Sequence, residues 1–150
     1  MSQSLARVVV HWVFSTKQRR PWLTEQVRER LYAYMASVYE RLECHALLIG
    51  GTADHVHVLS VLSRNHAPKT VVEEVKKTSS KWIKTVGPEF ADFQWQGGYG
   101  VFSVSESKVD AVRKYIAGQE EHHREMTFQE ELRGLLKRHG IEFDERYLWD

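Results

Sequence analysis

The order of its apolar segments is the feature that most limits what this chain can fold into. Segments rich in β-branched and aromatic residues, typical of strands, alternate with segments whose apolar residues recur with helical spacing. We expect strands at 7–15, 44–50, 55–62 and 101–105, and helices at 24–42 and 69–86. Their order predicts a ferredoxin-like split β-α-β-β-α-β fold of the α+β class, in which an antiparallel sheet carries these two helices on one face.

Two further helices are expected after this core. The first spans about 106–123. The second begins at Thr127, which has Glu130 at capping-box spacing, and ends near Gly140. The remaining C-terminal residues have no predicted element. No internal repeat or low-complexity linker interrupts the chain, so residues 1–150 are expected to form a single domain.

Composition excludes several classes of protein. The single cysteine, Cys44, rules out an internal disulfide framework and is compatible with a reducing cytoplasm. No apolar run approaches the length that spans a bilayer, and the first residues lack the pattern of a signal peptide. We therefore expect a cytoplasmic protein without a membrane partner.

Charge is nearly balanced overall but unevenly distributed. The net charge is +1, yet residues 1–20 contain four Lys or Arg and no acid, and residues 64–84 contain six against two acids. Residues 120–150 contain nine acids against five Lys or Arg. Such basic patches can bind phosphates locally, although an ordinary solvated surface is an equal alternative.

Two histidines one residue apart, His55 and His57, begin a predicted strand after a Gly-Gly turn. Because side chains alternate along a strand, both rings point to the same face. The rest of this strand is apolar, and polar rings buried on it need partners. A divalent metal is one solution, and hydrogen bonds to neighbouring groups are the other.

The helix predicted over 106–123 carries polar groups beside its apolar stripe. Lys108, Tyr115, Gln119 and His122 fall within one narrow sector of this helix. A phenol, an amide and an imidazole at the border of the core suit an active site. A boundary tyrosine that packs its ring and exposes its hydroxyl is the competing interpretation.

Three motifs together resemble a known family. They are Asp-His-Val-His after a glycine-rich turn, the stretch WQGGYGVFSVS, and Tyr115 followed four residues later by Gln119. In this order and spacing they resemble the single-tyrosine (Y1) transposases of the IS200/IS605 insertion sequences. These proteins belong to the endonucleases with a His-hydrophobic-His (HUH) motif, which have a ferredoxin-like core. The resemblance extends from the first strand to at least residue 123.

The resemblance implies a chemistry for four residues. His55, His57 and Gln119 would bind Mg²⁺ or Mn²⁺, and Tyr115 would attack phosphorus to give a 5′-phosphotyrosine and a free 3′-hydroxyl. The protein would be a DNA transposase that cleaves and rejoins single-stranded DNA at hairpin-bearing element ends. Since imidazole suits later metals than Mg²⁺, Mn²⁺ is a plausible best activator. A less favoured interpretation brings His122 and His123 into the metal site.

The resemblance also suggests partners and alternatives. Family members are homodimers whose tyrosine helix can complete the partner's active site in trans. A domesticated, repeat-associated transposase and a non-catalytic hairpin-binding protein are the alternatives. Trp95 or Tyr99 could stack on an unpaired base, or pack in the core instead. Our candidates for contacts to the DNA backbone are Arg19, Arg20, Lys77, Lys81 and Lys84.

Overall fold

Four strands form one antiparallel sheet within residues 2–150, the part of the chain that the computed structural model describes. They are β1 (Val9–Ser15), β2 (Ala46–Gly51), β3 (His55–Val61) and β4 (Gly100–Val104), in the order β2-β3-β1-β4. β3 lies between β1 and β2 and runs antiparallel to both. The prediction of a split, ferredoxin-like antiparallel sheet is therefore confirmed.

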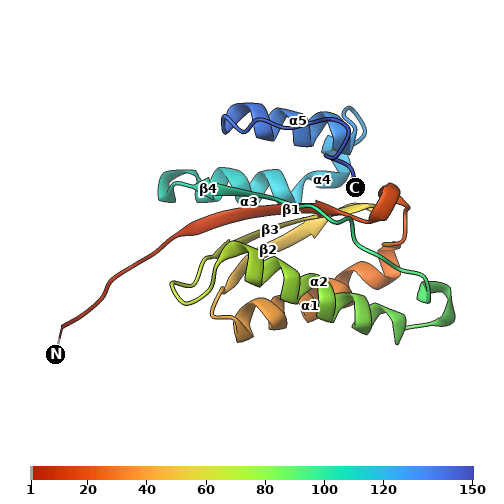
Figure 1. Cartoon of the computed structure of the whole chain (residues 1–150), viewed down its shortest axis with the longest axis horizontal. Helices are drawn as coiled ribbons and strands as arrows, with labels where there is room; N and C mark the ends of the chain where they lie inside the picture. Colours follow the sequence, from red (N-terminus) through yellow and green to blue (C-terminus); the bar gives the residue numbers. More distant parts are fainter. Residues whose placement is uncertain (1) are drawn as a thin grey trace.

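Two long helices cover one face of the sheet, as predicted (Figure 1). They are α1 (Glu25–Arg41) and α2 (Pro68–Lys84). Alternate residues of the two central strands point toward them and are buried with them in an apolar core. These strand residues are Val10, Trp12, Phe14, Val56 and Val58.

The opposite face is covered by the later helices (Figure 1). They are α3 (Val109–Ala117), α4 (Gln119–His122) and α5 (Phe128–Arg138). α3 packs over β2 and β3, where Gly50 lets it approach closely, because a Cβ there would lie 2.8 Å from the Ile116 carbonyl oxygen. α5 packs through its leucines against Val13 and Phe102 of β1 and β4. The sheet is therefore a middle layer between two sets of helices.

The prediction of a single helix over 106–123 is wrong in two respects. Its start is a short 3₁₀ turn at Glu106–Lys108, and Gly118 separates α3 from α4. Gly118 has φ −95° and ψ 18°, outside the helical range. Glycine has the greatest backbone freedom and a low helix propensity, so a break there is physically reasonable. Two more 3₁₀ turns lie at Lys17–Arg19 and Pro88–Phe90.

The C-terminal residues, which had no predicted element, close back on the molecule. Phe143, Leu148 and Trp149 pack against the apolar residues of α5. The Asp150 carbonyl accepts hydrogen bonds from the backbone N–H groups of Gly97 (2.7 Å) and Gly98 (3.2 Å).

Thr127 caps α5 by accepting a hydrogen bond from the Glu130 N–H, as its spacing predicted. Among the described helices, none is long and apolar enough to cross a membrane.

Candidate active site

The histidine pair begins β3 and faces the layer of α3 and α5. Alternation along the strand directs His55 and His57 to this face, and both rings are fully buried. The neighbouring strand β1 adds a third ring, because His11 Nε2 lies 2.7 Å from His57 Nδ1. Three imidazoles thus gather where the central strands pass beneath the junction of α3 and α5.

Tyr115 of α3 and Gln119 of α4 approach the same histidines from the layer of helices that covers this face of the sheet. Ile116 packs against Leu59 of β3 and anchors α3 on the sheet. Gln119 Oε1 then lies 3.0 Å from His55 Nε2, and the ring of Tyr115 lies 5.7 Å from that of His57 between centroids. The structure therefore brings together all four residues that the motifs singled out.

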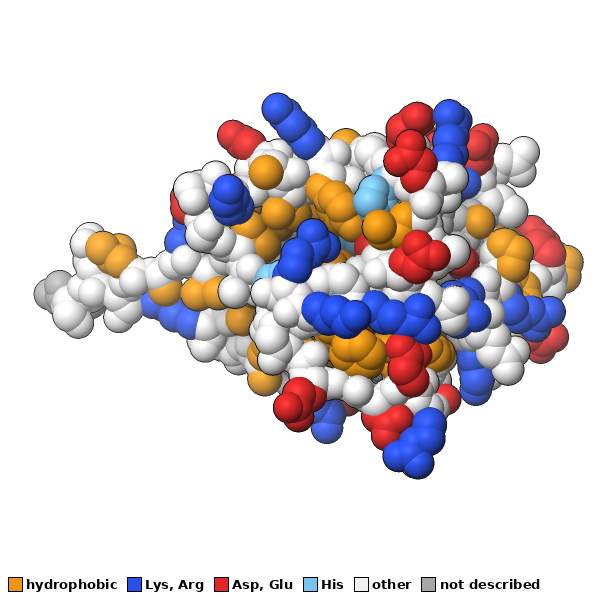
Figure 2. Space-filling model, turned by 90° about the horizontal axis from the view of Figure 1, so that it is seen from above, with side chains coloured by type: hydrophobic (Ala, Val, Ile, Leu, Met, Phe, Trp, Pro, Cys, Tyr) orange, Lys and Arg blue, Asp and Glu red, His pale blue; other side chains and the backbone are white. Residues whose placement is uncertain are grey.

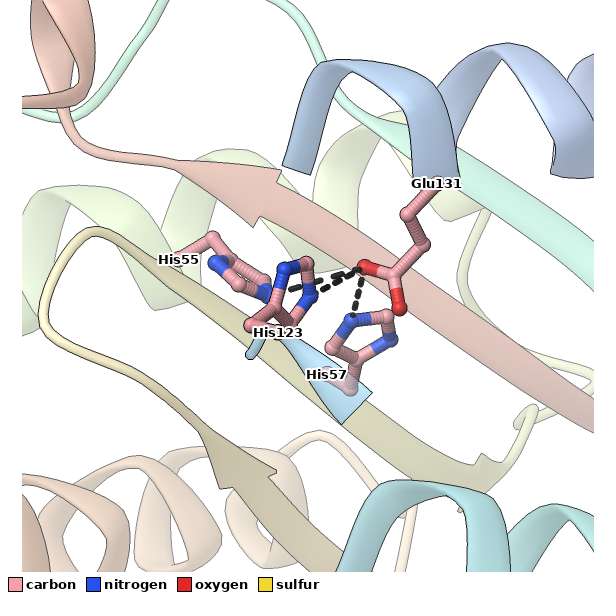
Figure 3. Close-up of side chains that lie close together, drawn as sticks. All are labelled: His55, His57, His123 and Glu131. Carbon is pink, nitrogen blue, oxygen red and sulfur yellow. Dashed lines mark hydrogen bonds and ion pairs between the residues drawn. The ribbon is translucent and has the colours of Figure 1, made fainter. Parts of the chain in front are cut away.

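A carboxylate that the sequence analysis missed lies at the centre of this group. Glu131 of α5 is 1% exposed. Its Oε1 lies 2.9 Å from His57 Nε2 and 3.2 Å from His123 Nε2 (Figure 3). Its Oε2 accepts hydrogen bonds from the Tyr115 hydroxyl and from Gln119 Nε2. Glu131 therefore links the predicted nucleophile to the histidine pair.

The sequence did contain a signal for Glu131. The apolar stripe of α5 consists of Phe128, Leu132, Leu135 and Leu136, and Glu131 occupies the missing position of the i, i+3, i+4, i+7, i+8 series. A charged residue in the buried stripe of a helix needs a compensating partner. That signal indicates that Glu131 has a polar partner. It does not identify the partner, because the position of α5 on the sheet is set by tertiary contacts that the local sequence does not show.

The charges of the cluster depend on one another. Burial raises the pKa of Glu131, but hydrogen bonds with His123 and His57 outweigh it and hold that pKa far below its usual range. Burial lowers the pKa of His123, yet the contact with Glu131 raises it above the ordinary value. Burial, and then the hydrogen bond and charge of Glu131, raise the pKa of Tyr115 well above 10. The phenol is therefore protonated at neutral pH.

The donor atoms of the cluster fit a divalent ion. One atom each from His55, His57, His123 and Glu131 lies within 4.8 Å of all the others. Three imidazoles and a carboxylate suit a transition metal such as Mn²⁺ better than Mg²⁺, which prefers oxygen ligands. Of the two C-terminal histidines considered from the sequence, His123 is the one that hydrogen-bonds within the cluster.

The predicted basic contacts are divided between the two sides of the sheet. Lys77, Lys81 and Lys84 are exposed on α2, on the far side from Tyr115. Arg19 lines a cavity of about 320 Å³ with His123 and Asp54. The remaining candidate, Arg20, stacks over the ring of Trp22. Only Arg19 is therefore placed beside the histidine cluster.

The two candidate stacking residues also differ. Trp95 is buried in the core, where its Nε1 donates a hydrogen bond to Ser79 Oγ, so the packing interpretation holds for it. Tyr99 is 38% exposed. Its ring lies 5.8 Å from the Lys76 ammonium. Of the pair, only Tyr99 offers a free ring surface in this structure.

The surface above the cluster carries charges of both signs (Figure 2), and the hollow in it is lined by basic side chains. Figure 2 shows this face, with Lys and Arg side chains across its middle among hydrophobic ones. A cavity of about 640 Å³ opens between α3 and α5, with His11 and Tyr115 in its wall. Lys108 and Arg138 also line it. A phosphate entering this cavity would meet positive charge on its way to the phenol.

Known proteins resemble this chain in sequence and in fold. The family model described as "Transposase IS200 like" matches residues 4–119. A solved structure of a candidate transposase from Deinococcus radiodurans R1 superposes with a TM-score of 0.62 at 20% identity, covering 79% of this chain and 98% of that one. A REP-associated tyrosine transposase bound to a REP hairpin gives a TM-score of 0.53 at 13% identity, covering 77% and 68%. No curated protein sequence matches the chain.

Proposed function

This chain belongs to the family of IS200-like transposases, and on that premise we propose that it cleaves and rejoins single-stranded DNA through a covalent link to Tyr115. The observation that carries the proposal is the convergence of His55, His57, Tyr115 and Gln119. They come from segments about sixty residues apart and meet in one buried cluster. A packing role alone gives no reason for a phenol, an amide and two imidazoles to meet.

The proposed reaction exchanges one phosphodiester for another. The Tyr115 oxygen attacks phosphorus, the bond from phosphorus to the 3′-oxygen breaks, and the phenol proton ends on the 3′-hydroxyl. The product is a 5′-phosphotyrosine, from which a 3′-hydroxyl can later expel the phenol, a better leaving group than an alkoxide. No phosphodiester is lost to water, so strands are rejoined without ATP.

The residues around Tyr115 have separate tasks in this proposal. His55, His57 and Gln119 would hold Mn²⁺ or Mg²⁺, which when bound supplies Lewis-acid stabilisation of the charge that builds on a phosphate oxygen. Glu131 Oε2 accepts a hydrogen bond from the Tyr115 hydroxyl and so fixes its direction. Lys108 and Arg138 line the cavity beside the phenol and would attract the DNA backbone.

We propose hairpin-bearing single-stranded DNA as the substrate. Support comes from the relative described as bound to a REP hairpin, together with the basic cavity beside Tyr115. The proposed contacts to the DNA backbone are Arg19, Arg20, Lys77, Lys81 and Lys84. A DNA strand that contacts both Arg19 and α2 must pass around the edge of the sheet. Active sites completed in trans by the tyrosine helix of a partner subunit stay a prediction. The homodimer stays a prediction.

Covalent capture tests the proposal. Hairpin oligonucleotides copied from the DNA flanking the gene are incubated with the protein and Mn²⁺ or Mg²⁺, and products are separated on a denaturing gel. We expect a protein–DNA adduct that needs metal and that Tyr115→Phe abolishes while hairpin binding is retained. Binding without an adduct would favour a non-catalytic hairpin-binding protein. An adduct formed by Tyr115→Phe would rule out this nucleophile.

A further inference from the structure

Glu131 occupies a position that normally holds an apolar residue. It lies in the buried stripe of α5, between Phe128 and Leu132, and its carboxylate is as buried as the leucines around it. A buried carboxylate is unfavourable unless charge and hydrogen bonds compensate it. A single imidazole would suffice for an ion pair, yet four lie within 4 Å of this group, and three of them, those of His55, His57 and His123, face its Oε1 atom.

The distances around Glu131 are those between ligands of one ion. Its Oε1 lies 2.9 Å from His57 Nε2, 3.2 Å from His123 Nε2 and 3.6 Å from His55 Nε2. Metal–nitrogen and metal–oxygen bonds of about 2.0–2.2 Å place neighbouring ligands of the same ion about 3 Å apart. The nitrogen and oxygen atoms therefore have the spacing of a common donor set.

Each of the three rings also has a hydrogen-bond partner at its Nδ1 atom. Nδ1 of His57 lies 2.7 Å from His11 Nε2, and Nδ1 of His55 lies 2.7 Å from Asp54 Oδ1. Nδ1 of His123 donates to a backbone carbonyl 2.7 Å away. Metal-binding histidines have this arrangement, in which a partner on one nitrogen fixes the ring and leaves the other for the ion. All three Nε2 atoms point to Glu131 (Figure 3).

We propose that Glu131 and His123 are metal ligands alongside His55 and His57. The inference rests on the proposed function for the presence of a metal, and it adds two ligands from the segment after residue 119, where the family match ends. Gln119 then has a second task, because its Nε2 donates to Glu131 Oε2 and orients the carboxylate. α5 becomes part of the active site rather than a cover for it.

This donor set also discriminates between Mn²⁺ and Mg²⁺, the two metals of the proposed function. Three imidazoles and one carboxylate leave no all-oxygen octahedron for Mg²⁺, which keeps its waters and binds nitrogen poorly. Mn²⁺ accepts both imidazole and carboxylate ligands. The inference therefore predicts that the protein binds Mn²⁺ more tightly than Mg²⁺.

Metal titration without DNA tests the inference. Mn²⁺ affinity is measured by calorimetry and by electron paramagnetic resonance for the wild type, Glu131→Gln and His123→Gln. We expect each substitution to weaken Mn²⁺ binding about tenfold or more. Glu130→Gln, the same change at the exposed neighbour, should leave it unaltered. His123 lies in a turn outside the helices, whereas Glu131 lies in the buried stripe of α5. The result for His123→Gln therefore stands even if Glu131→Gln proves unstable.

The outcomes separate this inference from the proposed function. Mn²⁺ binding by both variants at wild-type affinity would overturn the inference, while covalent capture by Tyr115 could still stand. Faster cleavage by Glu131→Gln at unchanged Mn²⁺ affinity would also overturn it, because the carboxylate would then block the site. Weaker Mn²⁺ binding in both variants would support it even if no DNA adduct formed. A wild type that binds no Mn²⁺ would overturn it outright.

Discussion

The two faces of the same sheet have opposite characters. Toward α1 and α2, β1 presents Trp12 and Phe14, which are packed among apolar side chains without any exposure. Toward α3 and α5, the same strand presents His11, and β3 presents His55 and His57. Since neighbouring residues of a strand point to opposite faces, one short segment can serve stability on one side and chemistry on the other.

The difference shows how each face stabilises its contents. The α1 and α2 face gains from removing apolar surface from water, which requires shape and volume but no particular partner. On the other face, polar groups are tolerated because they are paired, as His57 is with both His11 and Glu131. Substitutions on the apolar face should therefore lower stability, whereas substitutions on the polar face should lower activity or metal binding.

The largest expected effect is a loss of chemistry on the polar face. His57→Ala should lower metal-dependent cleavage on the order of 10³-fold, because Lewis-acid stabilisation contributes several kcal/mol. Adduct formation rate at saturating DNA measures this effect. His45→Ala, at an exposed histidine, is the matched control and should be unaffected. Full activity of His57→Ala would remove the histidine pair from the mechanism.

A loss of stability without a loss of chemistry is expected on the apolar face. Leu31 of α1 is fully buried in that core, so Leu31→Ala should lower the free energy of unfolding by about 2–5 kcal/mol. Urea denaturation measures this change. Mn²⁺ titration of the folded variant, under conditions in which unfolding has not begun, should give wild-type affinity. A large drop in affinity of the folded variant would show that the two faces are not independent.

A smaller effect is expected from the ring that supports His57. Burial, and then the charge of the neighbouring His57, lower the pKa of His11 to about 3. His11 is therefore neutral and acts as a hydrogen-bond partner of His57. His11→Phe should weaken Mn²⁺ binding about 10–100-fold, because the orientation of His57 is no longer fixed. Partial recovery in His11→Asn, which restores a polar partner, would distinguish positioning from packing. Equal affinities in all three proteins would contradict this role.

The regular part of the molecule was predictable from the sequence. Strand and helix periods gave the element order and the sheet, because the apolar pattern of a strand such as 9–15 reflects burial on both faces. The shared face of His55 and His57 follows from alternation alone. Tyr115 and Gln119 gained a role only through the family resemblance, since their spacing also suits a packed boundary helix.

The parts that sequence reasoning missed depend on tertiary docking. Glu131 lies in an apolar stripe, but its partners are set by how α5 crosses the sheet. His11 meets His57 because β1 and β3 pair in one register, with Val13 opposite His57. Gly118 interrupts a helix that the apolar stripe predicted to be continuous. For Glu131 the local pattern indicated a buried polar group, and only the fold identified its partners.

Locating the attached DNA tests the central claim most directly. The wild-type adduct, formed with Mn²⁺, is treated with nuclease and trypsin, and the modified peptide is sequenced by mass spectrometry. Trypsin cleavage at Lys114 and Arg124 isolates Tyr115 as the only tyrosine of its peptide. We predict a nucleotide phosphate on that tyrosine. A nucleotide on another residue, such as the exposed Tyr99 or Tyr147, would contradict the assignment of the polar face as the catalytic centre.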